Sequence, residues 1–265
     1  MRIKQSSLLT ALQITILAAA CTFTAFAQSD EREVHIGVKA GLSLPNLVGG
    51  SDQEITKDYK SLLTANFGGF VDVQLHKNTS LQIEVDYAPQ GGKRNGIQPV
   101  TQAIPGLPVL PAGNYYFANF NNTAKLDYIE VPVMLKYRAR KEKQVGFYVN
   151  GGPYMGFLMK ATTVTSGTSP LYLNNAGTVP VLIGPGTPFP AIPFDAKTDV
   201  TDDLNRFNFG VTGGGGITFK HGKNYAFIDG RVAYGLTTLQ KDTLNDGKSR
   251  TGNVVFSFGY AFGVK

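Results

Sequence analysis

The residues best suited to chemistry in this sequence are ionisable side chains placed at every second position of apolar segments. The most prominent set combines four carboxylates with three cations: Glu84, Asp86, Glu130, Asp229, Lys136, Arg138 and Arg231. Gathered in a narrow interior, they could form a salt-bridge and hydrogen-bond network that satisfies buried polar groups. They could alternatively form a selectivity constriction or a proton-linked gate.

The sequence offers little for catalysis or metal binding. Its three histidines, His35, His76 and His221, fall at turns and strand starts, and no His-rich spacing brings them together. No G-x-S-x-G, H-E-x-x-H or P-loop pattern occurs. We therefore predict no catalytic residue, no cofactor and no metal site. The formal net charge of +6 is scattered along the chain, so we expect no nucleic-acid partner.

The N-terminus has the features of a secretory signal peptide. A basic start precedes an apolar run over residues 8–20, and Ala25-Phe26-Ala27 provides an A-x-A site. We predict a signal peptide over 1–27, cleaved after Ala27, and a mature domain over 28–265. In a second interpretation, Cys21 is lipidated instead of removed.

Alternation with a period of two, the signature of a β-strand, recurs eight times in the mature chain. The expected strands cover residues 34–42, 67–75, 81–87, 129–137, 145–157, 207–219, 226–236 and 254–262. No apolar run beyond the N-terminus reaches the length of about 18 residues that a membrane-spanning helix needs. The sequence therefore predicts an all-β protein.

The two faces of these strands differ in charge. The side chains at alternate positions of each strand form two sets, or parities, one for each face. One parity is apolar and carries no charged residue, whereas the other mixes charges with many of the 31 glycines. A lipocalin-like barrel would bury the apolar face, and a membrane barrel would expose it to lipid. A water-facing exterior should be rich in Lys and Glu, whereas small residues suit the crowded interior of an eight-stranded barrel. The pattern favours the membrane barrel.

The connections between expected strands alternate between short and long. The long segments are about 45–66, 91–125, 161–205 and 238–250. Short periplasmic turns and long extracellular loops are typical of outer-membrane barrels. We predict an eight-stranded antiparallel up-and-down transmembrane β-barrel in the outer membrane of a Gram-negative bacterium, with both termini in the periplasm.

Several short motifs resemble those of PorT-like "porin family" outer-membrane β-barrel proteins. They are Gly37–Ser43, Leu81–Tyr87, Leu126–Pro132, Asn150–Tyr154, Phe207–Gly210 and Arg231–Leu236. The resemblance covers nearly all of the mature chain except the long loops. It implies the fold and the location more firmly than the task, because most members of that family are uncharacterised. One branch of the family is associated with an outer-membrane protein-secretion system.

Two long loops carry apolar and aromatic residues that could contact a partner. They are Tyr115, Tyr116, Phe117, Leu171, Leu173, Val181, Ile183, Phe189 and Phe194. These residues could equally pack on one another as a cap. Our hypothesis is that the two loops meet over the lumen and carry whatever binding occurs there.

These patterns predict a non-enzymatic protein with a role in envelope structure, surface interaction or secretion. Its expected partners are outer-membrane lipid and, through the extracellular loops, envelope or secretion proteins. The alternatives are a small passive diffusion pore and a periplasmic lipocalin-like binder. The sequence indicates neither a ligand nor an oligomeric state.

Overall fold

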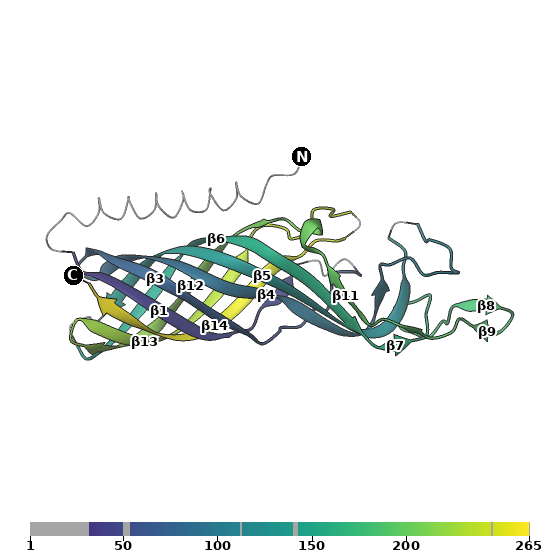
Figure 1. Ribbon diagram of the computed structural model, residues 1–265, viewed down its shortest axis with the longest axis horizontal. Helices are drawn as coiled ribbons and strands as arrows, with labels where there is room; N and C mark the ends of the chain where they lie inside the picture. The colour runs from purple at the N-terminus through teal and green to yellow at the C-terminus, as the bar shows by residue number, and fades with distance from the viewer. Residues whose placement is uncertain (1–31, 50–53, 112, 140–142, 245, 265) are drawn as a thin grey trace.

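The computed structural model describes residues 32–49, 54–111, 113–139, 143–244 and 246–264, and shows an antiparallel β-barrel (Figure 1). The expected signal peptide and Cys21 lie outside these residues. The ring consists of β1 (Val34–Ser43), β3 (Thr64–His76), β4 (Thr79–Val100), β5 (Tyr116–Ala139), β6 (Val145–Ser166), β12 (Phe207–His221), β13 (Asn224–Gly235) and β14 (Arg250–Gly263). The predicted all-β, eight-stranded fold is confirmed.

Strand pairing follows the order of the chain and then closes on itself. Each ring strand pairs antiparallel with the next, and β1 returns to β14 from His35 opposite Gly263 to Ser43 opposite Val255. Closure removes free strand edges, which a lipid environment does not tolerate. No helix within the described ranges is long and apolar enough to cross a membrane.

Several short elements lie at one end of the ring. β2 (Asn46–Val48) pairs with β14, and β11 (Ala196–Asp199) pairs with β6. The remaining elements are β7 (Thr168–Ser169), β8 (Leu182–Gly184), β9 (Thr187–Pro188), β10 (Ile192–Pro193) and the 3-10 helix η1 (Thr201–Asp203). We call this the long-strand end. The opposite short-turn end carries the β3–β4 and β12–β13 turns, the end of β5 and the start of β6.

Three neighbouring strands are much longer than the rest. β4, β5 and β6 have 22, 24 and 22 residues, whereas the other ring strands have 10 to 15. A tilted strand needs about 9–11 residues to cross a membrane. At about 3.3 Å per residue, roughly ten extra residues form a projection of about 30 Å. Figure 1 shows these strands continuing beyond the barrel.

Part of the sequence expected as loop is therefore strand. β4 continues to Val100 and β5 begins at Tyr116, inside the expected loop 91–125, and β6 continues to Ser166. The alternation disappears there because both faces of the projection are free to be polar, as in Asn121-Asn122-Thr123. Backbone pairing continues without it, from Gly91 opposite Lys125 to Val100 opposite Tyr116.

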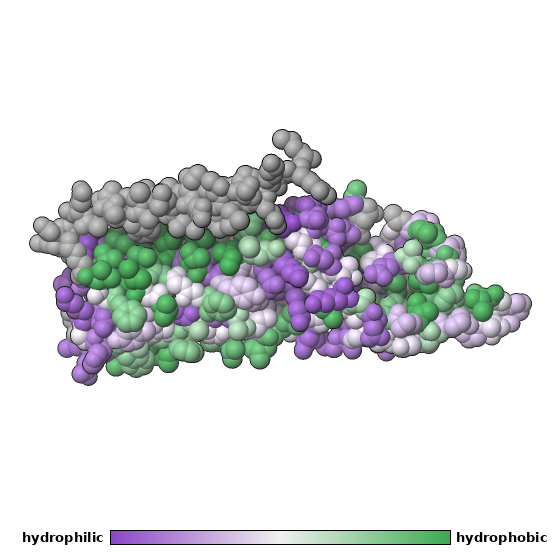
Figure 2. Space-filling model, in the orientation of Figure 1, coloured by the Kyte–Doolittle hydropathy of each residue, from purple (hydrophilic) through white to green (hydrophobic). Residues whose placement is uncertain are grey.

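The apolar parity of the ring strands points outward. Large exposed hydrophobic side chains occur on all of these strands, among them Val38, Phe67, Val85, Leu135, Val149, Phe209, Val232 and Phe258. Figure 2 shows hydrophobic residues gathered over the barrel wall and hydrophilic residues at the short-turn end and where β4–β6 leave the barrel. The interior holds the polar parity instead.

Glycines on the inner face of β12 make room for large side chains. A Cβ on Gly214 would lie 2.8 Å from Arg231 Cα and 2.9 Å from its Cγ, and one on Gly216 would lie 2.7 Å from the hydroxyl of Tyr148. All three distances are too short for a real Cβ contact. The glycines of this strand therefore allow Arg231 and Tyr148 to occupy the lumen.

Candidate functional site

Glu84 is the centre of a buried polar network inside the barrel. Its Oε2 accepts a hydrogen bond from Arg231 Nη1 at 2.7 Å and another from Lys39, and its Oε1 accepts from Gln82. These side chains come from β1, β4 and β13, on different sides of the ring. One carboxylate thus connects strands that are far apart in the sequence.

The network continues toward the short-turn end through Lys136. Its Nζ donates to Gln82 Oε1 at 2.8 Å and lies 3.4 Å from Asp72 Oδ2, which also binds Arg138. The ammonium is 4.1 Å from the centroid of the Tyr148 ring, within the range of a cation–π interaction. Lys136 therefore bridges two carboxylate-centred groups of the network through Gln82.

The other carboxylates also have partners. Asp229 accepts from Arg231 Nε at 2.7 Å, and from the hydroxyls of Ser257 at 2.7 Å and Tyr148 at 3.0 Å. Asp86 Oδ2 lies 2.8 Å from Lys39 Nζ. Glu130 accepts from Gln90 Nε2 at 2.9 Å.

The structure places all seven charged residues of the predicted set inside the barrel, each buried. The network also uses Lys39, Asp72 and Gln82, which the predicted set omits. The parity of the strands places Lys39 and Asp72 on the same polar face, so the sequence did contain a signal for them. Gln82 was missed because only charged residues were considered, although its amide joins Lys136 to Glu84.

Side chains fill the interior around this network. The cavity next to Asp86, Glu130 and Arg231 has a volume of about 30 Å³. That volume is on the order of one water molecule. An eight-stranded barrel is only just wide enough for its own side chains, which agrees with this packing.

An apolar cluster lies across the long-strand end of the lumen. Tyr128 of β5 and Leu158 of β6 occupy lumen-facing positions and are fully buried. Leu239 from the β13–β14 connection packs with them, and Leu47, Val200 and Leu204 pack against the cluster. The residues over the lumen thus come from the first and fourth long loops and, around η1, from the end of the third long loop.

The second and third long loops meet farther out, on the projection. Phe117 and Tyr172 exchange two backbone hydrogen bonds of 2.8 Å, and the rings of Phe120 and Phe194 stack with centroids 4.6 Å apart. Their buried core comprises Ile104, Tyr116, Ala118, Phe120, Leu171 and Val181. The two loops do pack together, as the hypothesis required, but on the projection. Only the end of the third loop, at Val200 and Leu204, reaches the cluster that covers the lumen.

The nine apolar loop residues divide into buried and exposed positions. Tyr116, Phe117, Leu171 and Val181 are buried in or beside this core, and Tyr115, Phe189 and Phe194 are half-buried. Leu173 and Ile183 are 53% and 58% exposed. Packing on the molecule itself therefore accounts for four positions, and two keep side chains that a partner could contact.

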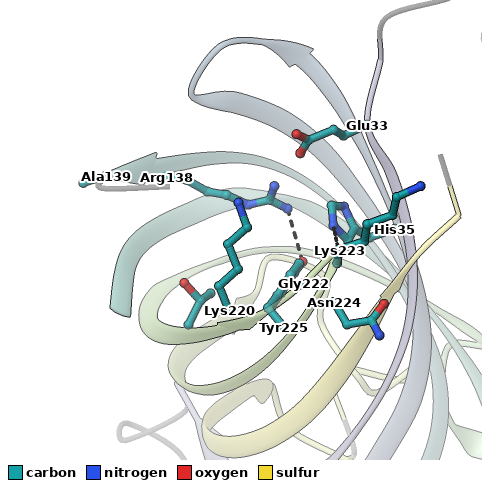
Figure 3. Close-up of a pocket in the computed structure, with 10 residues that line it drawn as sticks. Glu33, His35, Arg138, Ala139, Lys220, Gly222, Lys223, Asn224 and Tyr225 are labelled. Carbon is teal, nitrogen blue, oxygen red and sulfur yellow. Dashed lines mark hydrogen bonds between the residues drawn. The ribbon is translucent and has the colours of Figure 1, made fainter. Parts of the chain in front are cut away.

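The three histidines lie at the short-turn end. His76 ends β3 and His221 ends β12, whereas His35 at the start of β1 is buried beside Arg138 and Tyr225 in a cavity of about 240 Å³ (Figure 3). Within the described part of the chain, no group of three or more His, Cys, Asp or Glu side chains is placed to hold a metal ion.

A closed barrel with an apolar exterior and a charged interior is the arrangement of a membrane barrel. Residues 26–241 match the family described as outer membrane protein beta-barrel domain. The chain belongs to this family. It is an outer-membrane β-barrel protein of the Gram-negative envelope, and the apolar parity is its lipid face. The lipocalin-like alternative was wrong, because it requires that parity to point inward.

Solved structures of other outer-membrane barrels are similar to this chain. Neisserial surface protein A has 8% identity and a TM-score of 0.41, covering 88% of this chain and 98% of its own. Ail of Yersinia pestis has 14% identity and a TM-score of 0.37, covering 87% and 99%. The N-terminal barrel domain of Pseudomonas aeruginosa OprF has 8% identity and a TM-score of 0.32, covering 86% and 99%. No curated protein shows significant similarity to the chain.

A charge on the lipid face should be costly. Val38 lies in the middle of β1, between Tyr260 and Gly69, and is 60% exposed. We expect Val38→Arg to lower the free energy of unfolding by about 2–4 kcal/mol, the cost of Arg near the bilayer midplane. The measurement is equilibrium unfolding in urea after refolding into phospholipid vesicles, with Val38→Ala as the apolar control. A loss below about 0.5 kcal/mol, normal for a surface in water, would contradict the lipid-facing assignment.

Proposed function

We propose that this protein is a non-enzymatic outer-membrane barrel whose β4–β6 projection binds a partner outside the barrel. The observation that carries the proposal is the projection itself, a folded β structure with its own apolar core and an exposed apolar tip. A surface-interaction role fits such a structure, as does an accessory role in secretion like that associated with one branch of the PorT-like family.

The tip of the projection has the composition of a contact surface. Leu173, Val179, Leu182 and Ile183 are exposed large hydrophobics, and the last two belong to β8 of the β8–β9 hairpin. A gathering of exposed apolar side chains on a rigid support commonly marks an interaction site. The hairpin at residues 173–179 is held by backbone bonds from Leu173 to Val179 and from Gly177 to Asn174, so this part of the surface has a defined shape.

The filled lumen favours this role over a diffusion pore. The polar network occupies the middle of the barrel, and the cluster around Tyr128, Leu158 and Leu239 covers one end. We therefore expect no steady single-channel conductance from the purified protein in planar bilayers. In this proposal the seven charged lumen residues hold the barrel together.

The proposal includes an orientation in the membrane. The short turns face the periplasm with both termini, and the projection extends outside the cell, as in other outer-membrane barrels. The signal peptide is removed after Ala27. Outer-membrane lipid contacts the apolar wall, and the tip contacts an envelope or secretion protein.

Excising the β8–β9 hairpin, which carries Leu182 and Ile183, should separate binding from folding. Phe189 N donates to Val181 O at 2.7 Å, so residues 181 and 189 are already paired, and Asn-Gly can replace Leu182–Pro188 as a two-residue turn. We expect this variant to reach the outer membrane at the wild-type level and to retain its heat-dependent shift in gel migration. A photocrosslinker at position 183 in intact cells should capture a partner in the otherwise wild-type protein.

The matched control places the same crosslinker at Leu244, which is highly exposed on the β13–β14 connection at the barrel. The proposal requires an adduct from position 183 that is absent from position 244. Identical adducts from both positions, or none from position 183, would contradict it.

A further inference from the structure

A continuous row of aromatic and aliphatic side chains ends the lipid face on the side of the projection. Its members lie directly opposite one another on five neighbouring strands: Phe67 of β3, Tyr87 of β4, Ile129 of β5, Phe157 of β6 and Phe207 of β12. Ring centroids are 5.1 Å apart in the first pair and 5.5 Å apart in the last. Aromatic residues gather where the wall of a barrel meets the lipid headgroups. We call this row the girdle, and it marks the edge of the hydrocarbon layer.

Four lysines lie beyond the girdle on the same outward face of the sheet. Lys160 is in the first row of side chains past the girdle on this face, Lys125 is in the second and Lys93 is in the third, each diagonal to the one before. Lys60 lies directly opposite Lys93. All four residues are exposed. Because residues paired across a sheet share a face, the four side chains form one series.

The charge of this series is not balanced by the protein. No salt bridge within the described part of the chain uses any of the four lysines. Two carboxylates share the face: Asp127, which accepts from the hydroxyl of Tyr87 at 2.8 Å, and Asp199, which accepts from the threonine two residues farther along. Like charges placed directly opposite, as in Lys60 and Lys93, destabilise a sheet. An external anion would therefore stabilise this face.

The depth of the series matches a headgroup larger than that of a simple phospholipid. At about 3.3 Å per residue and a strand tilt of about 40°, Lys160, Lys125 and Lys93 lie about 5, 10 and 15 Å above the girdle. The headgroup layer of an ordinary leaflet is only about 5–7 Å thick. In Figure 2 hydrophilic residues follow directly on the hydrophobic wall where β4–β6 leave the barrel. The series thus spans more than one layer of phosphate.

We propose that this face binds a lipid of the leaflet on the projection side, through a headgroup that carries at least two phosphate groups. Lys160 and Lys125 contact the phosphate nearer the acyl chains. Lys93 and Lys60 contact the outer phosphate, which removes their mutual repulsion. The acyl chains lie against the girdle and the apolar wall below it. The site lies at the base of the projection and does not depend on the partner proposed for the tip.

The test is titration of the delipidated full-length protein, in neutral detergent, with bisphosphorylated lipid A, followed by native mass spectrometry. We expect tighter binding than that of the monophosphorylated form and of phosphatidylcholine. Lys93→Gln combined with Lys125→Gln should weaken binding about 25-fold, since each lysine beside an anionic lipid contributes roughly a factor of five. Lys77→Gln combined with Lys223→Gln, at exposed lysines of the short-turn end, changes the net charge equally and should bind as the wild type does.

Equal affinity for the three lipids, or equal weakening by the two double variants, would overturn the proposal. The deacylated bisphosphorylated headgroup separates a lipid from a soluble phosphate ligand: an affinity equal to that of intact lipid A would contradict a lipid site. An unchanged heat-dependent shift in gel migration shows that each variant is folded. Crosslinking from position 183 tests the tip separately, so the failure of one proposal leaves the other standing.

Discussion

Glu84→Leu should lower the free energy of unfolding of the barrel by about 3–5 kcal/mol, the usual cost of removing one partner from a buried ion pair. Glu84 is fully buried and accepts hydrogen bonds from Lys39, Gln82 and Arg231. The substitution leaves two cations and an amide without this acceptor, because the leucine side chain cannot accept a hydrogen bond. Glu84→Gln keeps the size and one acceptor oxygen, so its loss should be smaller.

The control for Glu84 is an ion pair of the same kind on the surface. Asp202 Oδ1 lies 2.6 Å from Arg206 Nη2, and the Asp202 side chain is 92% exposed. Asp202→Asn should cost less than about 1 kcal/mol, as exposed pairs usually do. Urea unfolding in vesicles measures both variants, and equal losses would show that the lumen network is not a major source of stability.

The strands that form the barrel wall could be predicted from the sequence, but which lumen side chains contact one another could not. Alternation determines which side chains face inward, since adjacent residues of a strand point to opposite faces. Which of them meet depends on the stagger between strands and on closure of the ring. Lys39 and Glu84 are 45 positions apart and on strands that are not neighbours, yet they bind directly. No local pattern contains that information.

The projection was only partly predictable, for a different reason. Inside the membrane, lipid requires one face of each strand to be apolar, and this produces the alternation that reveals the strand. Beyond it, the two strands still pair through the backbone, with Gly92 of β4 opposite Ala124 of β5 and Asn95 opposite Asn121. Their side chains are under no such constraint, so the sequence there is similar to that of a loop. The aromatic residues at 116–120 were the available signal for a continuing strand.

Leu171 and Leu173 show why contact residues could not be separated from core residues in the sequence. They are the same residue type two positions apart in one loop, yet Leu171 is 1% exposed and Leu173 is 53% exposed. Val181 N donates to Leu171 O, whereas Leu173 N donates to Val179 O in the adjoining 173–179 hairpin. Burial of Leu171 comes from long-range packing with residues such as Ala118 and Ile104.

This pair also gives a direct test of the projection as a rigid support. Leu171→Ala should destabilise the projection by about 2–5 kcal/mol, the range for truncating a packed leucine, whereas Leu173→Ala should change little. Because proteolysis follows the population of the opened form, a loss of about 3 kcal/mol should raise the initial cleavage rate within 168–194 roughly 100-fold. Gel migration of unheated samples should show the barrel intact in both variants, since the core around Leu171 is separate from the lumen network.

Equal protease sensitivity of the two variants would mean that the core around Leu171 does not keep the tip folded. The proposed binding surface would then have to order on contact with its partner, at an entropic cost that lowers affinity. A large difference, with the barrel unaffected in both, would show that the membrane domain and the projection are separately stabilised. Partner binding could then be altered at Leu173 and Ile183 without loss of the barrel, which is the property expected of a binding structure carried on a closed membrane anchor.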